Sequence, residues 1–426
     1  MSGHPGFATS RSSSHLDMAR GLAAVAVLIY HVRYRFFLDY GDLVVRDRIT
    51  TAWYFVTAFG HDAVMVFFVL SGFLIGSSVL RAHKAGRWSV AEYATSRAVR
   101  LSAVLIPGLL LTALWDRLGL TFFGQTMIYT GAARPFVHDF FDVAARSGLG
   151  TLAGNLLYLQ TVLVPPFGSN DALWSLAFEG WYYVLFPLGI ACVMPGRSVL
   201  VRLAAALLAA GAGYLLGPTI VRYMLFWLVG VGVCLLPHVR LIAAWRRVAV
   251  PAALLACVAL ISLGHVGTVR AALGGTLYAA DTLTSVSFAV LLYVLLHDGA
   301  PAGAGWYPRA AAVLAGCSFT LYLVHLPLLV FLRALVNPGR SWAPTPATIG
   351  ASLAIAIAAW IYAYGVAQVT EARTPALRTA ALRWLGLRPH ARQPEWSAAD
   401  GADGGAAMTF TRGVVEATPA TMERRR

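Results

Sequence analysis

The sequence predicts an all-α fold: a polytopic transmembrane helical bundle with about ten spanning helices and both termini in the cytoplasm. Of the 426 residues, 58% are hydrophobic and only 12% are charged, and the mean hydropathy is +0.67. A soluble domain has about 25% charged residues. Apolar runs of spanning length recur along the chain and are separated by basic loops, which is typical of a multi-pass membrane protein.

Each expected span is an apolar run of about 20 residues, the length that crosses a hydrocarbon core of about 30 Å as a helix. The runs lie at residues 17–38, 62–80, 98–117, 173–194, 202–217, 219–237, 248–264, 274–296, 312–334 and 346–367. Segment 150–166 is apolar but short, contains Asn155 and Gln160, and ends in two prolines. We therefore expect it to be a buried or interfacial helix that does not cross the membrane.

The formal net charge of +14 would suggest a nucleic-acid partner for a soluble protein, but here the basic residues lie between apolar runs. With the N-terminus inside, most Lys and Arg residues fall on the inner side, as the positive-inside rule requires. The charge therefore indicates orientation, and we expect a multi-pass protein of the inner or plasma membrane. Its partners would include the lipid bilayer and exclude nucleic acid.

The chain is expected to form one membrane domain over residues 16–378. Residues 1–15 are rich in Ser and Gly and should be disordered, and residues 379–426 should form a largely disordered cytoplasmic tail. The four cysteines lie inside apolar runs without a CxxC pair, so we expect neither a metal site nor a redox site.

The first apolar run carries an arginine and a histidine with ten residues between them, Arg20 and His31. On a helix they lie roughly 16 Å apart, about half the thickness of the hydrocarbon core. Arg20 can therefore lie at the membrane surface while His31 lies past the midplane. An ionisable side chain at that depth usually faces a polar cavity and marks a functional site.

Two further spans carry an ionisable side chain to a similar depth. Glu179 lies about two turns into the span that starts near residue 173, and His325 lies in the outer half of the span that starts near residue 312. Together with His31 they suggest one site, in which a neutral imidazole near a carboxylate can act as a general base. A structural hydrogen bond within the bundle is the alternative for either histidine.

The helix that carries Glu179 also carries Ser175 one turn before it and Tyr183 one turn after it. Residues at this spacing share a helix face, so the three side chains should line the same pocket. An aromatic-belt helix with a single hydrogen-bonded carboxylate is the alternative.

Arg97 and Arg100 lie one turn apart at the expected inner end of the third span. Two guanidinium groups at this spacing suit a nucleotide that carries several phosphates. They could equally be ordinary topology-determining residues.

These motifs resemble those of the bacterial integral-membrane O-acyltransferases of the acyltransferase-3 type, over about residues 14–378. The motifs are LDMARGLAAVAVLIYH with Arg20 and His31, AVMVFFVLSGFLIG around Ser71, SRAVRL with Arg97 and Arg100, WSLAFEGWYY with Glu179, and SFTLYLVHLP with His325. Each motif alone is unspecific, but five in the same order are specific for the family.

The resemblance implies transfer of an acyl group from cytoplasmic acyl-CoA, with acetyl-CoA as the expected donor, to a hydroxyl group. The acceptor would be a carbohydrate, a cell-envelope glycan or a glycosylated metabolite, and no metal would take part. Arg97 and Arg100 would bind the donor phosphates, with Arg20 contacting the donor or fixing the first helix. His31 would take the acceptor proton, and Glu179 would orient His31 or stabilise the imidazolium.

The resemblance also implies a substrate pocket, while the chemical route through it stays open. The residues expected to line the pocket are Ser71, Ser175, Tyr183, His325 and Asp62. Direct transfer and a ping-pong route through an acylated side chain are both compatible with the motifs, as are acetyl and longer acyl groups.

Two other function classes are compatible with the intramembrane polar residues. A proton-coupled transporter or flippase could use His31, Glu179 and His325 as a relay, although it would predict paired broken helices and an internal repeat. A structural membrane protein could contain the same residues without chemistry, but this would leave the separation of the arginine pair from the histidines unexplained.

Overall fold

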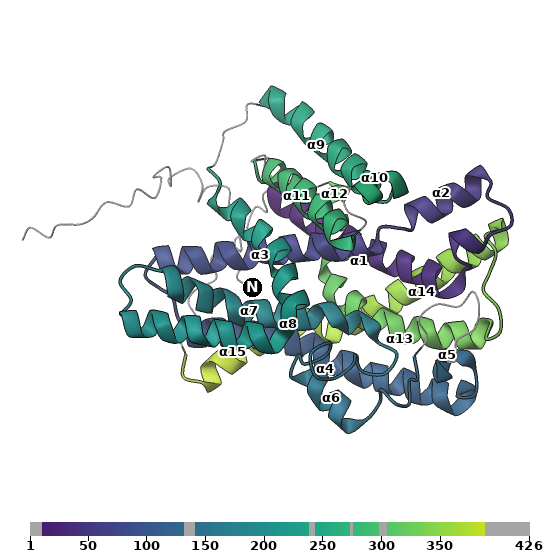
Figure 1. The fold of residues 1–426 in the computed structure, drawn as a ribbon, viewed down its shortest axis with the longest axis horizontal. Helices are drawn as coiled ribbons and strands as arrows, with labels where there is room; N and C mark the ends of the chain where they lie inside the picture. Colours follow the sequence, from purple (N-terminus) through teal and green to yellow (C-terminus); the bar gives the residue numbers. More distant parts are fainter. Residues whose placement is uncertain (1–10, 132–140, 238–242, 273–275, 298–304, 388–426) are drawn as a thin grey trace, which may run out of the picture.

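The computed structural model describes residues 11–131, 141–237, 243–272, 276–297 and 305–387 (Figure 1). This part of the chain is built from helices, and its only β-structure is a few isolated bridges. The predicted all-α class is therefore confirmed.

The helices are named in chain order. They are α1 (Arg11–Phe36), α2 (Arg48–Val56), α3 (Gly60–Lys84), α4 (Val90–Phe123), α5 (Met127–Thr130), α6 (Leu149–Leu156), α7 (Trp174–Val193), α8 (Val199–Leu235), α9 (Ala243–Gly264), α10 (Gly267–Ala272), α11 (Leu277–Leu296), α12 (Trp306–Gly316), α13 (Ser318–Val336), α14 (Pro346–Val369) and α15 (Thr374–Trp384), with 3₁₀ turns η1 (Tyr40–Asp42), η2 (Asp171–Leu173) and η3 (Glu371–Arg373).

Eight helical stretches in the described residues are long and apolar enough to cross a membrane, which fits a multi-pass membrane protein. The expected number was about ten, and one difference is α1. This helix has sufficient length but does not belong to the eight, because charged residues are spread along it. These residues are Arg11, Asp17, Arg20, Arg33 and Arg35.

The other difference lies in α8, which contains both of the runs expected at 202–217 and 219–237. Its two helical segments meet at Gly217 without a loop and count as one stretch among the eight. Gly217 has a φ of 77°, a conformation that glycine adopts without steric cost, and Pro218 follows it. The break therefore occurs where the sequence allows the helix to be interrupted.

Segment 150–166 does not form a long helix, in agreement with the sequence. Helix α6 is short, and buried side chains bond the irregular backbone that follows it. The Asn155 side chain donates to the Pro165 carbonyl (3.0 Å) and accepts from the Phe167 amide (3.1 Å), while Gln160 donates to a carbonyl just before α7 (2.9 Å). These bonds replace helical ones for backbone groups away from water.

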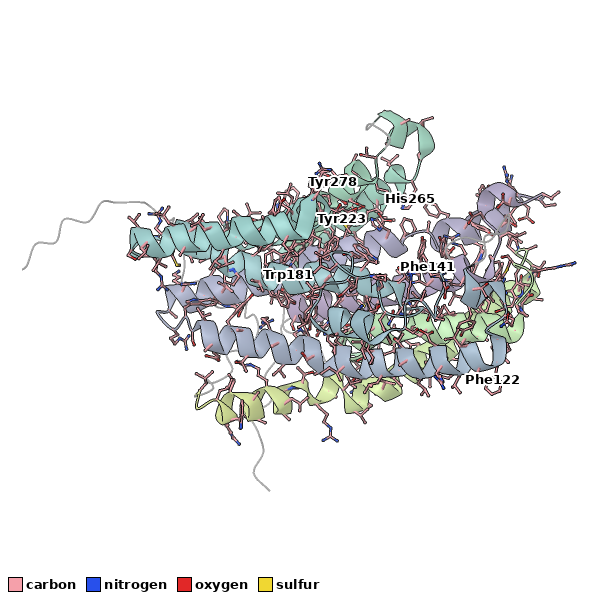
Figure 2. The ribbon with its side chains drawn as sticks, turned by 60° about the horizontal axis from the view of Figure 1, so that its bottom comes forward. Phe122, Phe141, Trp181, Tyr223, His265 and Tyr278 are labelled. Carbon is pink, nitrogen blue, oxygen red and sulfur yellow. The ribbon has the colours of Figure 1, made fainter. Side chains whose placement is uncertain are left out.

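Helix α1 lies inside the bundle and contacts α3, α12, α13 and α14 (Figure 1). Helix α3 also packs along α8, α7 packs on α8, and α13 and α15 pack on α4. Helices α9 and α10 extend from the bundle, with α9 packed on α11 and α10 packed on α9. Tyr223 of α8, Tyr278 of α11 and His265 lie on the same side of the molecule, as Figure 2 shows.

Two glycines allow α3 and α8 to approach closely. A Cβ atom at Gly72 would overlap the carbonyl group of Trp227, and one at Gly230 would overlap the carbonyl group of Val69. Small residues at such crossings let helix backbones meet inside membranes. This contact brings Trp227 against the middle of α3, next to Ser71.

Both ends of the described chain are more helical than the sequence suggested. Helix α1 begins at Arg11, so residues 11–15, which were expected to be disordered, are helical. Helix α15 extends to Trp384, inside the segment expected to be a tail. The remaining parts of those two predictions, residues 1–10 and 388–426, lie outside the described residues.

Candidate functional site

A cavity of about 760 Å³ lies within the bundle between α1, α3, α4, α7, α13 and α15. It brings together most of the site residues expected from the sequence: Arg20, Ser71, Arg97, Arg100, Ser175, Glu179 and Tyr183. Three expected residues do not line it: His31, His325 and Asp62. The described residues thus form a shared cavity for the arginines and the carboxylate, with the histidines outside its wall.

Glu179 is fixed in the cavity wall by two hydroxyl groups. Its Oε1 atom accepts from Ser71 Oγ (3.0 Å) and from the Tyr183 hydroxyl, one turn further along α7. Ser71 Oγ in turn accepts from Trp227 Nε1 (3.2 Å). In the described part of the chain, Oε2 has no hydrogen bond and remains able to accept one from a bound molecule.

Arg97 provides a positive charge at the cavity wall. Its guanidinium carbon lies 5.9 Å from the ring centroids of both Tyr93 and Tyr183, within the range of cation–π attraction. The Tyr93 hydroxyl donates to the Tyr183 carbonyl (3.0 Å), which joins α4 to α7. The Arg97 Nε atom is buried and has no hydrogen-bond partner among the described residues, so the guanidinium can still bind an anion.

More arginines surround this part of the cavity, which we call the arginine-rich end: Arg81, Arg87, Arg97, Arg100 and Arg378. Arg378 of α15 pairs with Glu92 (2.9 Å) and donates to Ser96 Oγ (2.7 Å), both on α4. These bonds hold α15 beside the cavity. Besides Glu179, two more glutamates line the wall, Glu92 and Glu371, but the arginines outnumber the three carboxylates.

Arg20 lies on the cavity wall and also bonds a neighbouring helix. It lines the cavity, and its Nη2 atom donates to the Ala315 carbonyl at the end of α12 (3.2 Å). It also forms an ion pair with Asp17 one turn earlier in α1 (3.5 Å). Arg20 therefore fixes α1 against α12 while its charge faces the cavity.

His31 and His325 form a hydrogen-bonded pair between α1 and α13, with His31 Nδ1 2.9 Å from His325 Nε2. The other ring nitrogen of His325, Nδ1, lies 2.8 Å from the Leu321 carbonyl and must donate to it, because a carbonyl only accepts. In the neutral pair, His325 Nε2 then accepts from His31 Nδ1. His31 Nε2 consequently carries a lone pair, which is the form that a general base requires.

The cavity ends one helical turn short of this pair. Along α13 its wall includes Ser318, Phe319 and Tyr322, and the next residue on the same face is His325. The ring centroids of Tyr322 and His325 are 6.3 Å apart, and the Tyr322 hydroxyl lies 2.6 Å from Ser175 Oγ. Tyr322 therefore separates the cavity from the histidines.

This arrangement differs from the expected contact between His31 and Glu179. Among the described residues, His31 is hydrogen-bonded to His325, and Glu179 to Ser71 and Tyr183. The Tyr322 ring contacts the His325 ring, and its hydroxyl bonds Ser175, one turn from Glu179 on α7. The side chain that bonds to His31 in this structure is His325.

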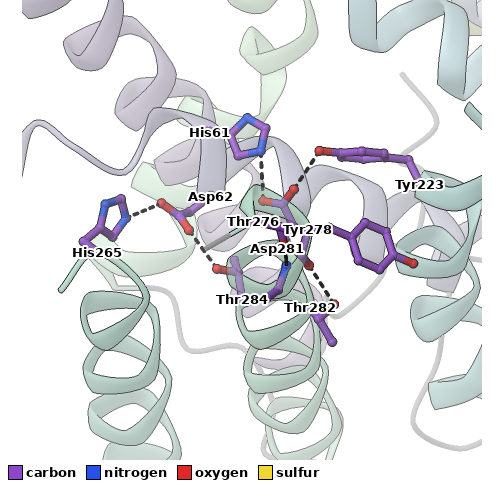
Figure 3. Close-up of polar contacts among 10 residues, drawn as sticks. His61, Asp62, Tyr223, His265, Thr276, Tyr278, Asp281, Thr282 and Thr284 are labelled. Atoms are coloured by element: carbon purple, nitrogen blue, oxygen red, sulfur yellow. Dashed lines mark hydrogen bonds and ion pairs between the residues drawn. The ribbon is translucent and has the colours of Figure 1, made fainter. Parts of the chain in front are cut away.

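Asp62 also differs from its expected place in the substrate pocket. Its carboxylate accepts from His265 Nε2 (2.7 Å) and from Thr284 Oγ1 (2.7 Å), as Figure 3 shows. Helix α3 is thereby bonded both to the turn between α9 and α10 and to α11. An adjacent network in the same figure consists of His61, Asp281 and Tyr223. Both networks connect helices and lie outside the cavity wall.

Three site residues were not found from the sequence: Tyr93, Trp227 and Tyr322. Tyr322 precedes His325 by three residues, so helical spacing could have indicated that the two share a face. Trp227 lies in an apolar run, and Tyr93 lies before the arginine pair. Their roles depend on which helices pack together, and a local sequence pattern does not show this.

Residues 14–364 match a family model described as an acyltransferase domain. This range contains the arginine-rich end except Arg378, the cavity residues of α3 and α7, and the histidine pair. No curated protein and no solved structure matches the chain.

Proposed function

The chain belongs to the acyltransferase-3 family, and we propose that it is a membrane O-acyltransferase that uses acyl-CoA, with acetyl-CoA as the preferred donor. The acceptor is a hydroxyl group of a carbohydrate, a cell-envelope glycan or a glycosylated metabolite, and the setting is the inner or plasma membrane. The observation that carries the proposal is the cavity, which extends from an arginine-rich end to within one turn of a neutral histidine pair.

At the arginine-rich end, the donor's phosphates bind to Arg97 and Arg100. Both arginines line the cavity, so their guanidinium groups can reach a phosphate bound there. Guanidinium groups bind phosphate through two parallel, charge-assisted hydrogen bonds. Arg20 adds a further positive charge on the wall of the same cavity.

The acyl end of the donor then points toward Ser175, Tyr322 and the histidine pair. Glu179 lies on this path, and its free Oε2 atom can accept a hydrogen bond from an amide of the donor's pantetheine arm. We thus assign Glu179 to donor binding, in place of the expected contact with His31.

His31 acts as the general base. Its Nε2 lone pair takes the proton of the acceptor hydroxyl as that oxygen bonds to the thioester carbonyl carbon. When the tetrahedral intermediate collapses, the C–S bond breaks and the proton passes from His31 to the leaving thiolate. His325 maintains the required tautomer of His31 by accepting from its Nδ1 atom throughout.

A transporter that relays protons through His31, Glu179 and His325 would require a connected chain of these groups. Among the described residues, the two histidines are bonded to each other, while Glu179 is bonded to hydroxyl groups elsewhere in the cavity wall. This separation favours the acyltransferase.

The proposal is tested with membrane vesicles from cells that express the full chain, incubated with acetyl-CoA labelled in the acetyl group. We expect label in the carbohydrate fraction of vesicles that contain the protein and none in vesicles without it. Alkaline treatment should release the label, as expected of an ester. Retention of all label on CoA would contradict the proposal, and longer acyl-CoA donors in the same assay would define the accepted chain length.

A further inference from the structure

Ser175 and Tyr322 form a pair of hydroxyl groups at the end of the cavity that lies nearest to the histidine pair. They come from α7 and α13, their oxygens are 2.6 Å apart, and both residues line the cavity. Both are largely buried, with 6% and 7% of their surface exposed. The pair therefore occupies the part of the cavity nearest to the histidines.

This pair has one hydrogen-bond donor more than it uses. In the contact between them, one hydroxyl donates and the other accepts, so the accepting residue keeps its own O–H. Neither Ser175 nor Tyr322 has another side-chain hydrogen bond in the described part of the chain. Whichever way the pair is oriented, one O–H remains able to donate to a molecule in the cavity.

The pair also lies close to the proposed base. Tyr322 and His325 are one turn apart on α13, with ring centroids 6.3 Å apart, and His325 holds His31. Phe67 packs edge-on against Tyr322, with a centroid distance of 5.9 Å, and restricts its ring. A donor held rigidly beside a base is the arrangement that stabilises charge in acyl transfer.

We propose that the hydroxyl groups of Ser175 and Tyr322 bind the carbonyl oxygen of the acyl thioester and stabilise its negative charge in the tetrahedral intermediate. As the acceptor oxygen bonds to the carbonyl carbon, the C=O electron pair moves to the carbonyl oxygen. That oxygen accepts a hydrogen bond from the spare O–H. The acceptor proton goes to His31 and then to the departing thiolate when the C–S bond breaks. This inference rests on the proposed acyltransferase function.

The test uses Tyr322→Phe, Ser175→Ala and the double variant in the full chain, with labelled acetyl-CoA and rates normalised to folded protein by size-exclusion chromatography. Loss of one oxyanion donor lowers kcat by about 10²- to 10³-fold. We expect this loss in the double variant, which removes every O–H of the pair, with a donor KM within about twofold of wild type. Each single variant keeps one O–H but loses the partner that positions it, so it should lower kcat by a smaller factor.

Two further variants separate catalysis from structure. Tyr182→Phe removes a buried hydroxyl from the same helix, one that donates to the Ile220 carbonyl (2.9 Å), and should keep kcat near wild type. Ser175→Thr retains a hydroxyl and should restore most of the rate lost in Ser175→Ala. An active wild type together with an unchanged kcat in the double variant, or with a change only in its KM, would overturn this inference alone. A wild type that transfers no acetyl group would instead overturn the proposed function.

Discussion

His31 Nδ1 lies 2.9 Å from His325 Nε2, and the Leu321 carbonyl fixes the direction of that hydrogen bond. The two histidines come from α1 and α13, so the contact also ties together two helices that are far apart in sequence. Because His325 donates to a carbonyl, His31 keeps a lone pair on Nε2. The pair thus resembles a base with its orienting partner, in which a second imidazole takes the place of a carboxylate.

This relationship predicts graded effects of substitution. His325→Ala should lower kcat, because His31 then loses the acceptor that fixes its tautomer. His325→Gln should retain more activity, since an amide oxygen can also accept from His31 Nδ1. The check is the acetyl-transfer rate of each variant; equal rates for His325→Ala and His325→Gln would contradict the tautomer argument.

The arginine-rich end predicts a selective effect on donor binding. Arg97→Ala should raise the KM for acetyl-CoA by about tenfold while kcat changes little, because a charge-assisted hydrogen bond to phosphate is lost. Arg202→Ala is the matched control, since Arg202 is exposed on α8 and donates to the Cys192 carbonyl. An unchanged KM in Arg97→Ala, or an equal rise of KM in Arg202→Ala, would show that Arg97 does not bind the donor.

Glu179→Gln tests the carboxylate without removing its contacts. The amide oxygen can still accept from Ser71 and Tyr183, so thermal unfolding in detergent should change little. Loss of the negative charge should lower kcat/KM for acetyl-CoA by about tenfold, because hydrogen bonds to an ionised acceptor are the stronger ones. A kcat/KM equal to that of the wild type would show that the charge has no part in donor binding.

Much of the site could be predicted from helical spacing. Spacing alone placed Ser175, Glu179 and Tyr183 on one face of a helix, and the structure places all three on the cavity wall. The boundary expected between the runs 202–217 and 219–237 coincides with the interruption of α8 at Gly217.

The pairing of side chains between helices could not be predicted in this way. Whether His31 meets His325 or Glu179 depends on the rotation of α1 against its neighbours, which an apolar run does not record. For the same reason the sequence placed Asp62 in the pocket, whereas a partner in the turn after α9, His265, holds its carboxylate elsewhere.

The crossing of α3 and α8 predicts a difference between two neighbouring glycines. Gly230→Ala should destabilise the protein by about 1–3 kcal/mol, because its Cβ would overlap the Val69 carbonyl and the backbone would have to move. Gly232→Ala, on the same helix, has no atom within 4 Å of the new Cβ and should be neutral or slightly stabilising. The measurement is the thermal unfolding temperature of both variants in the same detergent. Equal unfolding temperatures would contradict the close crossing of α3 and α8.

The Asp62 network predicts a structural effect that is separate from catalysis. Asp62→Asn weakens the hydrogen bonds to His265 and Thr284, which hold α3 to the turn between α9 and α10 and to α11. Amide hydrogen exchange in α9 and α10 should become faster, while the acetyl-transfer rate stays within about twofold of wild type. A large loss of activity with unchanged amide hydrogen exchange would instead indicate that Asp62 belongs to the substrate site.

The most direct test of the central claim compares the acetyl-transfer rates of His31→Ala and His297→Ala. The vesicles receive labelled acetyl-CoA on the side of the membrane to which the arginine-rich end belongs. His297 is a buried histidine at the C-terminal end of α11, whereas the polar networks lie near the start of that helix. It bonds to the Tyr293 carbonyl. General-base catalysis contributes about 10²- to 10⁴-fold, so we predict a loss of that size in His31→Ala and a near-normal rate in His297→Ala. A His31→Ala protein that folds normally and transfers label at the wild-type rate would contradict the account.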